Sequence, residues 1–211
     1  MRARLGSLLA VTAILATPVA WSAATGPAPA SALDDISNAY RGKASYNEAL
    51  EVLKEADAYD ATGANAKEAE AAYRRARKKF QEATTWAPDL AEAWNGVGYT
   101  QRKLGSYIAA LSAYEQALKI RPGFPEAIEY RGEAYLGLNR VEDAKQTYLE
   151  LFDAHRPLAD KLLHSMRAWI QAQRTATKNT DVAALADFEK WVNERPPPLP
   201  TSNSSSSWGE T

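Results

Sequence analysis

Residues 91–122 read AEAWNGVGYTQRKLGSYIAALSAYEQALKIRP, and this stretch decides the fold. Small and apolar side chains recur at three- and four-residue spacings on both sides of Gly105 and Ser106, a pattern typical of two amphipathic helices joined by a tight turn. We expect the first helix over residues 90–104 and the second over residues 107–120. Pro122 follows the second helix, a place where proline often ends a helical segment.

The pattern returns about 34 residues further along the chain, and part of it stands one such period earlier. The aligned sets are Trp94 and Ile128, Gly98 and Gly132, Leu104 and Leu138, Ala76 with Ala110 and Ala144, Phe80 with Tyr114 and Tyr148, Ala83 and Ala117, and Pro88 and Pro122. A fixed period of this length indicates stacked supersecondary units. Glycine inside a helix costs about 1 kcal/mol relative to alanine. Close helix packing accounts for Gly98, whereas the pattern offers no reason for Gly96.

On these residues the chain resembles the tetratricopeptide repeat (TPR) family, exported bacterial type. Residues 91–122 agree with the family pattern at ten positions and residues 125–156 at five, with departures at Gln101, Arg131 and Leu151. The agreeing positions are Trp94, Val97, Gly98, Leu104, Gly105, Tyr107, Ala110, Tyr114, Ala117 and Pro122, then Gly132, Tyr135, Leu138, Ala144 and Tyr148. The resemblance implies an all-α fold, a right-handed α-solenoid of antiparallel helix pairs with a helical C-terminal cap.

The helical domain is predicted to span residues 34–195. A divergent first unit occupies about 45–88, with helices near 45–59 and 66–85. Capping helices occupy about 158–194, near 158–173 and 181–194, since terminal units of such arrays are commonly atypical. Residues 25–33 are predicted to be a flexible leader. Residues 196–211, rich in proline and serine, are predicted to be a disordered tail, because they contain too little apolar surface to offset the entropy of ordering.

Residues 1–24 have the order of a secretory signal peptide. Arg2 and Arg4 precede a short apolar run over 5–16, and small residues follow Pro18. The preferred cleavage point lies after Ala24, and a cut after Ala32 is the alternative. The apolar run is shorter than the roughly 20 residues that span a bilayer. We therefore expect no integral membrane segment after signal removal and, because the chain has no cysteine, a bacterial periplasmic or secreted location.

Composition removes several classes of chemistry. The formal net charge is −1, without the basic excess of nucleic-acid-binding proteins. The absence of cysteine excludes disulfides, thiolate metal sites and cysteine nucleophiles. His155 and His164 lie on opposite faces of any helix that they could share, so we expect no joint metal site. The sequence predicts no catalytic, cofactor-binding or metal-binding residue, and a hydrolase using Glu129 and Glu133, one helical turn apart, stays the weaker alternative.

The family resemblance implies a concave groove lined by the first helix of each unit. Its candidate partner-contacting residues are Glu92, Asn95, Tyr99, Arg102, Lys103, Glu126, Glu129, Glu133 and Leu136. The implied function is a non-enzymatic scaffold or adaptor that binds a peptide or protein segment in this groove. An accessory factor of a cell-envelope or polysaccharide-assembly system and a homo-oligomeric structural protein remain alternatives.

Overall fold

The computed structural model describes residues 30–63, 65–176 and 181–196, and these form eight helices without a strand. The helices are α1 (Ala30–Thr62), α2 (Ala66–Trp86), α3 (Ala91–Lys103), α4 (Tyr107–Ile120), α5 (Pro125–Gly137), α6 (Val141–Ala154), α7 (Arg156–Thr175) and α8 (Val182–Asn193). In this part of the chain, no helix has the length and apolar character needed to cross a membrane.

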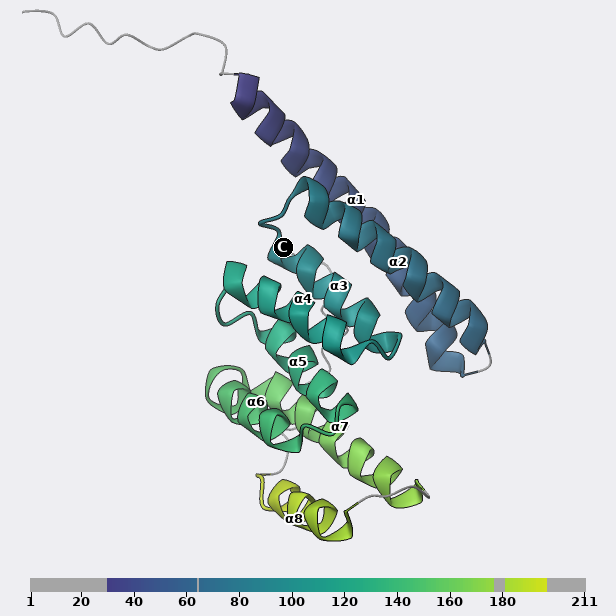
Figure 1. Ribbon diagram of the computed structural model, residues 1–211, viewed down its shortest axis with the longest axis vertical. Coiled ribbons are helices and arrows are strands. Elements are labelled where there is room, and N and C mark those ends of the chain that lie inside the picture. The colour runs from purple at the N-terminus through teal and green to yellow at the C-terminus, as the bar shows by residue number, and fades with distance from the viewer. Residues whose placement is uncertain (1–29, 64, 177–180, 197–211) are drawn as a thin grey trace, which may run out of the picture.

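Consecutive helices pair in antiparallel fashion, and the pairs stack along the long axis of the molecule from α1 and α2 to α8 (Figure 1). Each pair contacts its neighbour through α2 and α3, α4 and α5, or α6 and α7, and α7 also packs against α5. Contacts are therefore local along the array, as in other solenoids. The predicted all-α solenoid of antiparallel helix pairs is confirmed, and α7 and α8 close its C-terminal end.

The turn inside the two regular pairs, α3 with α4 and α5 with α6, has the same backbone conformation with a different residue. Gly105 has a positive φ of 73°, and Asn139, at the equivalent position of the next pair, has a φ of 57°. Ser106 N donates to the carbonyl oxygen of Gln101 at 2.8 Å, and Arg140 N donates to that of Tyr135 at 2.9 Å. These bonds satisfy carbonyls at the helix end that have no partner within the helix. Asparagine tolerates the left-handed region better than most residues, so it can replace glycine here.

Two glycines of α3 admit aromatic rings from different helices. A Cβ atom on Gly96 would lie 2.5 Å from the ring of Phe80 on α2, which is fully buried. A Cβ on Gly98 would overlap the ring of Tyr114 on α4. Gly98 thus permits packing within its own pair, and Gly96 permits packing against the preceding pair. The second contact supplies the reason for Gly96 that the repeat pattern lacked.

The N-terminal helix is longer than predicted. α1 begins at Ala30, whereas the expected helix starts near residue 45. The predicted flexible leader over 25–33 is therefore wrong for residues 30–33, which are helical. Residues 30–41 contain neither glycine nor proline and include three alanines, so nothing local interrupts the helix. The predicted signal peptide, residues 25–29 and residues 197–211 of the predicted tail lie outside the described residues.

Candidate functional site on the inner helices

A connected set of polar and aromatic side chains links α1, α2, α3, α5 and α7, and we call it the inner network. Its members are Asp57, Asp60, Tyr73, Tyr99, Arg102, Lys103, Glu129, Tyr130, Glu133, Lys161 and Ser165. All but Tyr73 come from the first helix of a pair. The inner network therefore runs across successive pairs, where the family resemblance implies a groove.

Asp57 of α1 is the anchor at the N-terminal end of the inner network. Its Oδ1 accepts hydrogen bonds from the hydroxyls of Tyr73 at 2.7 Å and Tyr99 at 2.9 Å. Burial, reinforced by the negative charge of Asp57, raises the pKa of both tyrosines well above the usual range. Next to them, Lys103 pairs with Asp60 and lies over the ring of Tyr73. These contacts join the first helix pair to the second.

Arg102 continues the inner network from α3 to α5. Its guanidinium pairs with Glu133 at 2.7 Å, and the side chain is only 15% exposed. The guanidinium carbon lies 5.1 Å from the ring centroid of Tyr99 and 5.2 Å from that of Tyr130. Glu133 also accepts a hydrogen bond from Ser165 Oγ of α7 at 2.5 Å. The carboxylate of Glu133 on α5 thus links α3 and α7, so that the first helices of three consecutive pairs are joined.

Glu129 is the least solvated charged group of the inner network, with no exposed surface. Its Oε2 accepts a hydrogen bond from Lys161 Nζ of α7 at 3.0 Å, while its Oε1 has no hydrogen-bond partner in the described part of the chain. Burial, together with the negative charge of Glu133, raises the pKa of Glu129 to about 8, and the positive charge of Lys161 opposes the shift. Burial therefore favours the protonated form of Glu129 more than that of an ordinary carboxyl group.

Three of the nine predicted contact residues are buried, and their assignment to an exposed groove surface is wrong for this structure. Asn95 is 2% exposed, Glu129 0% and Leu136 3%. Glu129 is covered because α7 packs against α5 and brings Lys161 over it. Leu136 belongs to the apolar core that α5, α6, α7 and α8 share. A binding partner cannot touch these side chains unless the helices separate.

The other six predicted residues are partly exposed: Glu92, Tyr99, Arg102, Lys103, Glu126 and Glu133. Four of them belong to the inner network. Glu92 pairs instead with Arg121 at 2.8 Å, at the link that follows α4. Glu126 lies in the first turn of α5. The accessible part of the predicted site is therefore centred on the C-terminal half of α3 and on Glu133.

Sequence reasoning missed several of the side chains that hold this site together. Asp57, Asp60, Tyr73, Tyr130, Lys161 and Ser165 were not predicted. Lys161 and Ser165 follow their partners Glu129 and Glu133 by 32 residues, so a search at the repeat period passes over them. The signal for Lys161 is its positive charge, which complements Glu129 at a separation close to the repeat period. Asp57 lies on a helix whose link to α2 breaks the period.

The acid pair proposed for hydrolysis is engaged in structural contacts. Glu129 is buried beside Lys161, and Glu133 is bound by Arg102 and Ser165. The described residues contain no group of three or more histidine, aspartate or glutamate side chains placed to hold a metal ion. His155 caps α7, where its Nδ1 accepts from Leu158 N at 3.3 Å.

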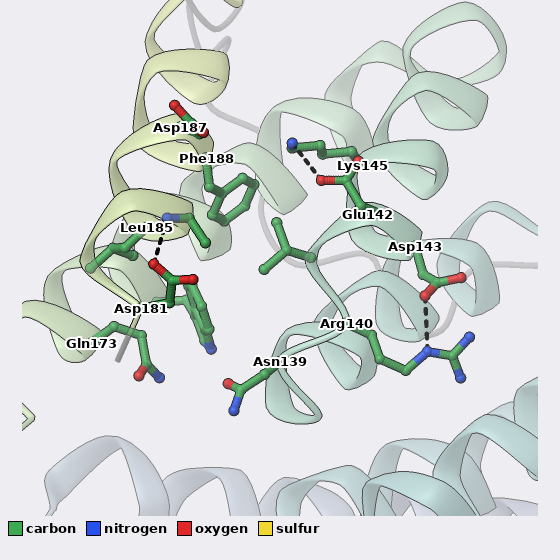
Figure 2. Close-up of a pocket in the computed structure, with 13 residues that line it drawn as sticks. Asn139, Arg140, Glu142, Asp143, Lys145, Gln173, Asp181, Leu185, Asp187 and Phe188 are labelled. Carbon is green, nitrogen blue, oxygen red and sulfur yellow. Dashed lines mark hydrogen bonds and ion pairs between the residues drawn. The ribbon is translucent and has the colours of Figure 1, made fainter. Parts of the chain in front are cut away.

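A separate pocket of about 640 Å³ lies between the N-terminal end of α6, the C-terminal half of α7 and α8 (Figure 2). Trp169, Leu185 and Phe188 supply apolar lining, and most charges are paired among themselves. Glu142 pairs with Lys145 at 2.7 Å and Asp143 with Arg140 at 2.9 Å, while Asp181 accepts two backbone hydrogen bonds at the start of α8. The repeat pattern did not predict this pocket.

Comparison with known proteins finds a similarity to one family over part of the chain. Residues 101–170, from the end of α3 into α7, match the model described as "Tetratricopeptide repeat". This segment is similar to tetratricopeptide repeats. It covers about a third of the chain, including α4, α5 and α6. The tetratricopeptide resemblance seen in the repeat period is supported there, whereas the exported bacterial type stays a prediction.

No curated protein matches the chain. Among solved structures, one described as "First TPR of Spaghetti (RPAP3) bound to HSP90 peptide SRMEEVD" is similar at 18% sequence identity with a TM-score of 0.44. The similarity covers 58% of this chain and 93% of that one.

Proposed function

We propose that this protein is a non-enzymatic interaction scaffold that binds a peptide or protein segment along α3 and α5. One observation carries the proposal. The partly exposed members of the inner network form a continuous band of charged and aromatic side chains across consecutive first helices, at Tyr99, Arg102, Lys103 and Glu133. The match of residues 101–170 to tetratricopeptide repeats supports the same role.

The inner network suits binding because its side chains are held in place before a partner arrives. Arg102 is fixed by Glu133 and by two aromatic rings, and Lys103 is fixed by Asp60. Ordered side chains lose little rotamer entropy on association, which favours affinity. Both charge signs and an aromatic ring lie within one short surface. We expect a partner segment that carries both positively and negatively charged groups beside an aromatic or aliphatic side chain.

The test places a photo-crosslinking amino acid at Tyr99 and, as the matched control, at Ile108, which is 75% exposed on α4. A partner captured from position 99 but not from position 108 is then purified and its affinity measured. We expect Tyr99→Ala and Lys103→Ala each to weaken binding about tenfold or more, and Ile108→Ala to leave it unchanged. Equal affinity for all variants, with folding verified by circular dichroism, would show that another surface binds.

We propose further that the protein is exported, to a bacterial periplasm or the exterior. The support is the order of Arg2, Arg4, the apolar run 5–16 and the small residues that end at Ala24. N-terminal sequencing of the protein recovered from the producing cells tests this. A start at Thr25 leaves α1 whole, whereas a start at Leu33 removes its first residues. Recovery of an intact Met1 in the cytoplasm would contradict export.

A further inference from the structure

Residues 30–41, at the start of α1, have no antiparallel partner among the described helices. The whole of α1 has 33 residues and α2 has 21. Gly42 of α1 packs against Ala87, the residue that follows α2. A Cβ atom added at Gly42 would lie only 3.0 Å from the backbone nitrogen of Ala87. Residues 30–41 therefore project beyond the end of the first helix pair, and Figure 1 shows this end of α1 standing clear of the other helices.

The projecting segment carries a stripe of exposed apolar side chains. Leu33 is 55% exposed, Ile36 65% and Tyr40 78%, and their spacing of three and four residues sets them on one face. At about 100° per residue, Gly42 lies about 180° around the helix from Leu33. Since Gly42 faces Ala87, the stripe points away from the rest of the array. No described helix covers it.

We propose that this stripe is the interface of a homodimer in which two copies of α1 pack antiparallel around a two-fold axis near Ser37 and Asn38. In such an arrangement the same patch serves both subunits. Ile36 of one copy then lies beside Tyr40 of the partner subunit, and each Leu33 packs toward the partner's Lys43, whose aliphatic stem can cover apolar surface.

The charges beside the stripe fit a second copy in antiparallel orientation. Asp34 and Arg41 lie on the same flank of the helix, about 100° and 80° from Leu33. A two-fold axis brings equal flanks together, so Asp34 faces Arg41 of the partner subunit, and the pair occurs twice. The guanidinium of Arg41 lies 4.9 Å from the ring centroid of Trp86, which holds it on this flank.

The opposite flank of α1 is also compatible with antiparallel packing of the two helices and disfavours parallel packing. Ala32 and Ala39 lie there with Lys43, so small side chains allow the two helices to approach closely. Antiparallel packing places Lys43 opposite Ala32 of the partner subunit. Parallel packing would instead bring Arg41 of one copy to Lys43 of the other, a repulsive contact. Charge complementarity therefore selects the antiparallel dimer.

The expected association is weak. Three large side chains and two alanines bury much less than the roughly 800 Å² per partner of a standard interface. We expect dissociation constants in the range of micromolar or weaker, with dimer visible at tens of micromolar by sedimentation velocity.

The decisive experiment is a charge exchange in the full chain, measured by sedimentation velocity over a concentration series. Asp34→Arg alone and Arg41→Asp alone should each weaken dimerisation about tenfold. The double variant, Asp34→Arg with Arg41→Asp, should restore it, and an equimolar mixture of the two single variants should associate better than either alone. Ile36→Glu should give monomer. A chain that is monomeric at all concentrations, or a dimer indifferent to these changes, would overturn the proposal.

A disulfide test reports the orientation directly, because the chain contains no native cysteine. Ser37→Cys lies beside the two-fold axis and should form a covalent dimer on mild oxidation. Ser112→Cys, on the exposed side of α4, is the matched control and should remain monomeric. Equal cross-linking of both variants would indicate random collision and would contradict the interface. None of these substitutions touches the inner network, so the result is independent of partner binding there.

Discussion

The hydroxyl of Tyr99 on α3 donates a hydrogen bond of 2.9 Å to Asp57 on α1, although 42 residues separate the two. The same carboxylate oxygen accepts from Tyr73 of α2 at 2.7 Å. A single acceptor therefore ties together the atypical first helix pair and the first regular repeat. Because each pair of a solenoid contacts only its neighbours, such a link controls how well the end of the array is held.

Asp57→Ala should lower the free energy of unfolding by about 1.5–3 kcal/mol, since two partly buried hydroxyls lose a charged acceptor. Urea denaturation measures the change. Glu51→Ala is the control, because Glu51 is exposed and pairs with Lys54 one turn away, and it should change stability by less than about 0.5 kcal/mol. Similar effects of both substitutions would show that water replaces Asp57 as the hydrogen-bond acceptor of the two tyrosine hydroxyls.

Gly96→Ala should destabilise the protein by about 1–3 kcal/mol, even though alanine favours helices, because the new methyl group would meet the ring of Phe80. Adding Phe80→Leu makes room for that methyl group. In a double-mutant cycle, the combined cost should be smaller than the sum of the two single costs. Additive costs would mean that Gly96 is required for another reason.

The stability of the protein should fall as the pH rises toward about 8, in part because of Glu129. Its pKa is raised from an ordinary value to about 8 in the folded state, so the native protein binds a proton that the unfolded chain releases near pH 4.5. The stabilisation from this proton is fully present below the pKa of Glu129 in the unfolded chain. It is lost as the pH rises through the pKa of Glu129 in the folded protein. Urea unfolding between pH 5 and 9 measures this slope.

Glu129→Gln keeps the shape of the side chain and cannot ionise. It should flatten the decline between pH 5 and 9 and be more stable than the parent protein at pH 9 by about 1–3 kcal/mol, the order of cost for a buried oxygen without a partner. Glu126→Gln, partly exposed in the first turn of α5, serves as the control and should keep the parental slope. An unchanged slope in Glu129→Gln would assign the decline to other groups.

Phe188→Ala should release α8 from the array. Phe188 is 1% exposed and contacts the rings of Trp169 and Trp191 at centroid distances of 5.8 and 6.4 Å. We expect a loss of about 3 kcal/mol and faster hydrogen exchange of the amides in α8. Val182→Ala, at a side chain that is 78% exposed, should change neither quantity. Unchanged exchange in Phe188→Ala would show that α8 is held by other contacts.

Local signals were sufficient for the regular repeats. The predicted helices over 90–104 and 107–120 correspond to α3 and α4 within one residue at each end. Each of these helices carries its own stop signal, because Gly105 supplies the left-handed turn and Pro122 follows the second helix. Such signals lie within a few residues of the structure that they determine, so a single sequence reveals them.

The candidate site was predictable only in part. Residues on one helical face were assigned to a common surface, but the depth at which each would lie depends on how closely the next pair packs. Lys161 of α7 closes over Glu129, and the core takes up Leu136. α7 lies beyond the two clear repeats, so the place of Lys161 could not be extrapolated from the preceding units.

By itself the sequence determined the helix pairs, their antiparallel order and the small residues between them, because periodicity, glycine and proline act through local backbone geometry. Only the tertiary structure decided which charged side chains of that array are buried, paired or exposed. Burial and ion pairing depend on distances between helices that lie far apart in the chain, as the links from Asp57 to Tyr99 and from Glu129 to Lys161 show, and no local pattern specifies those distances.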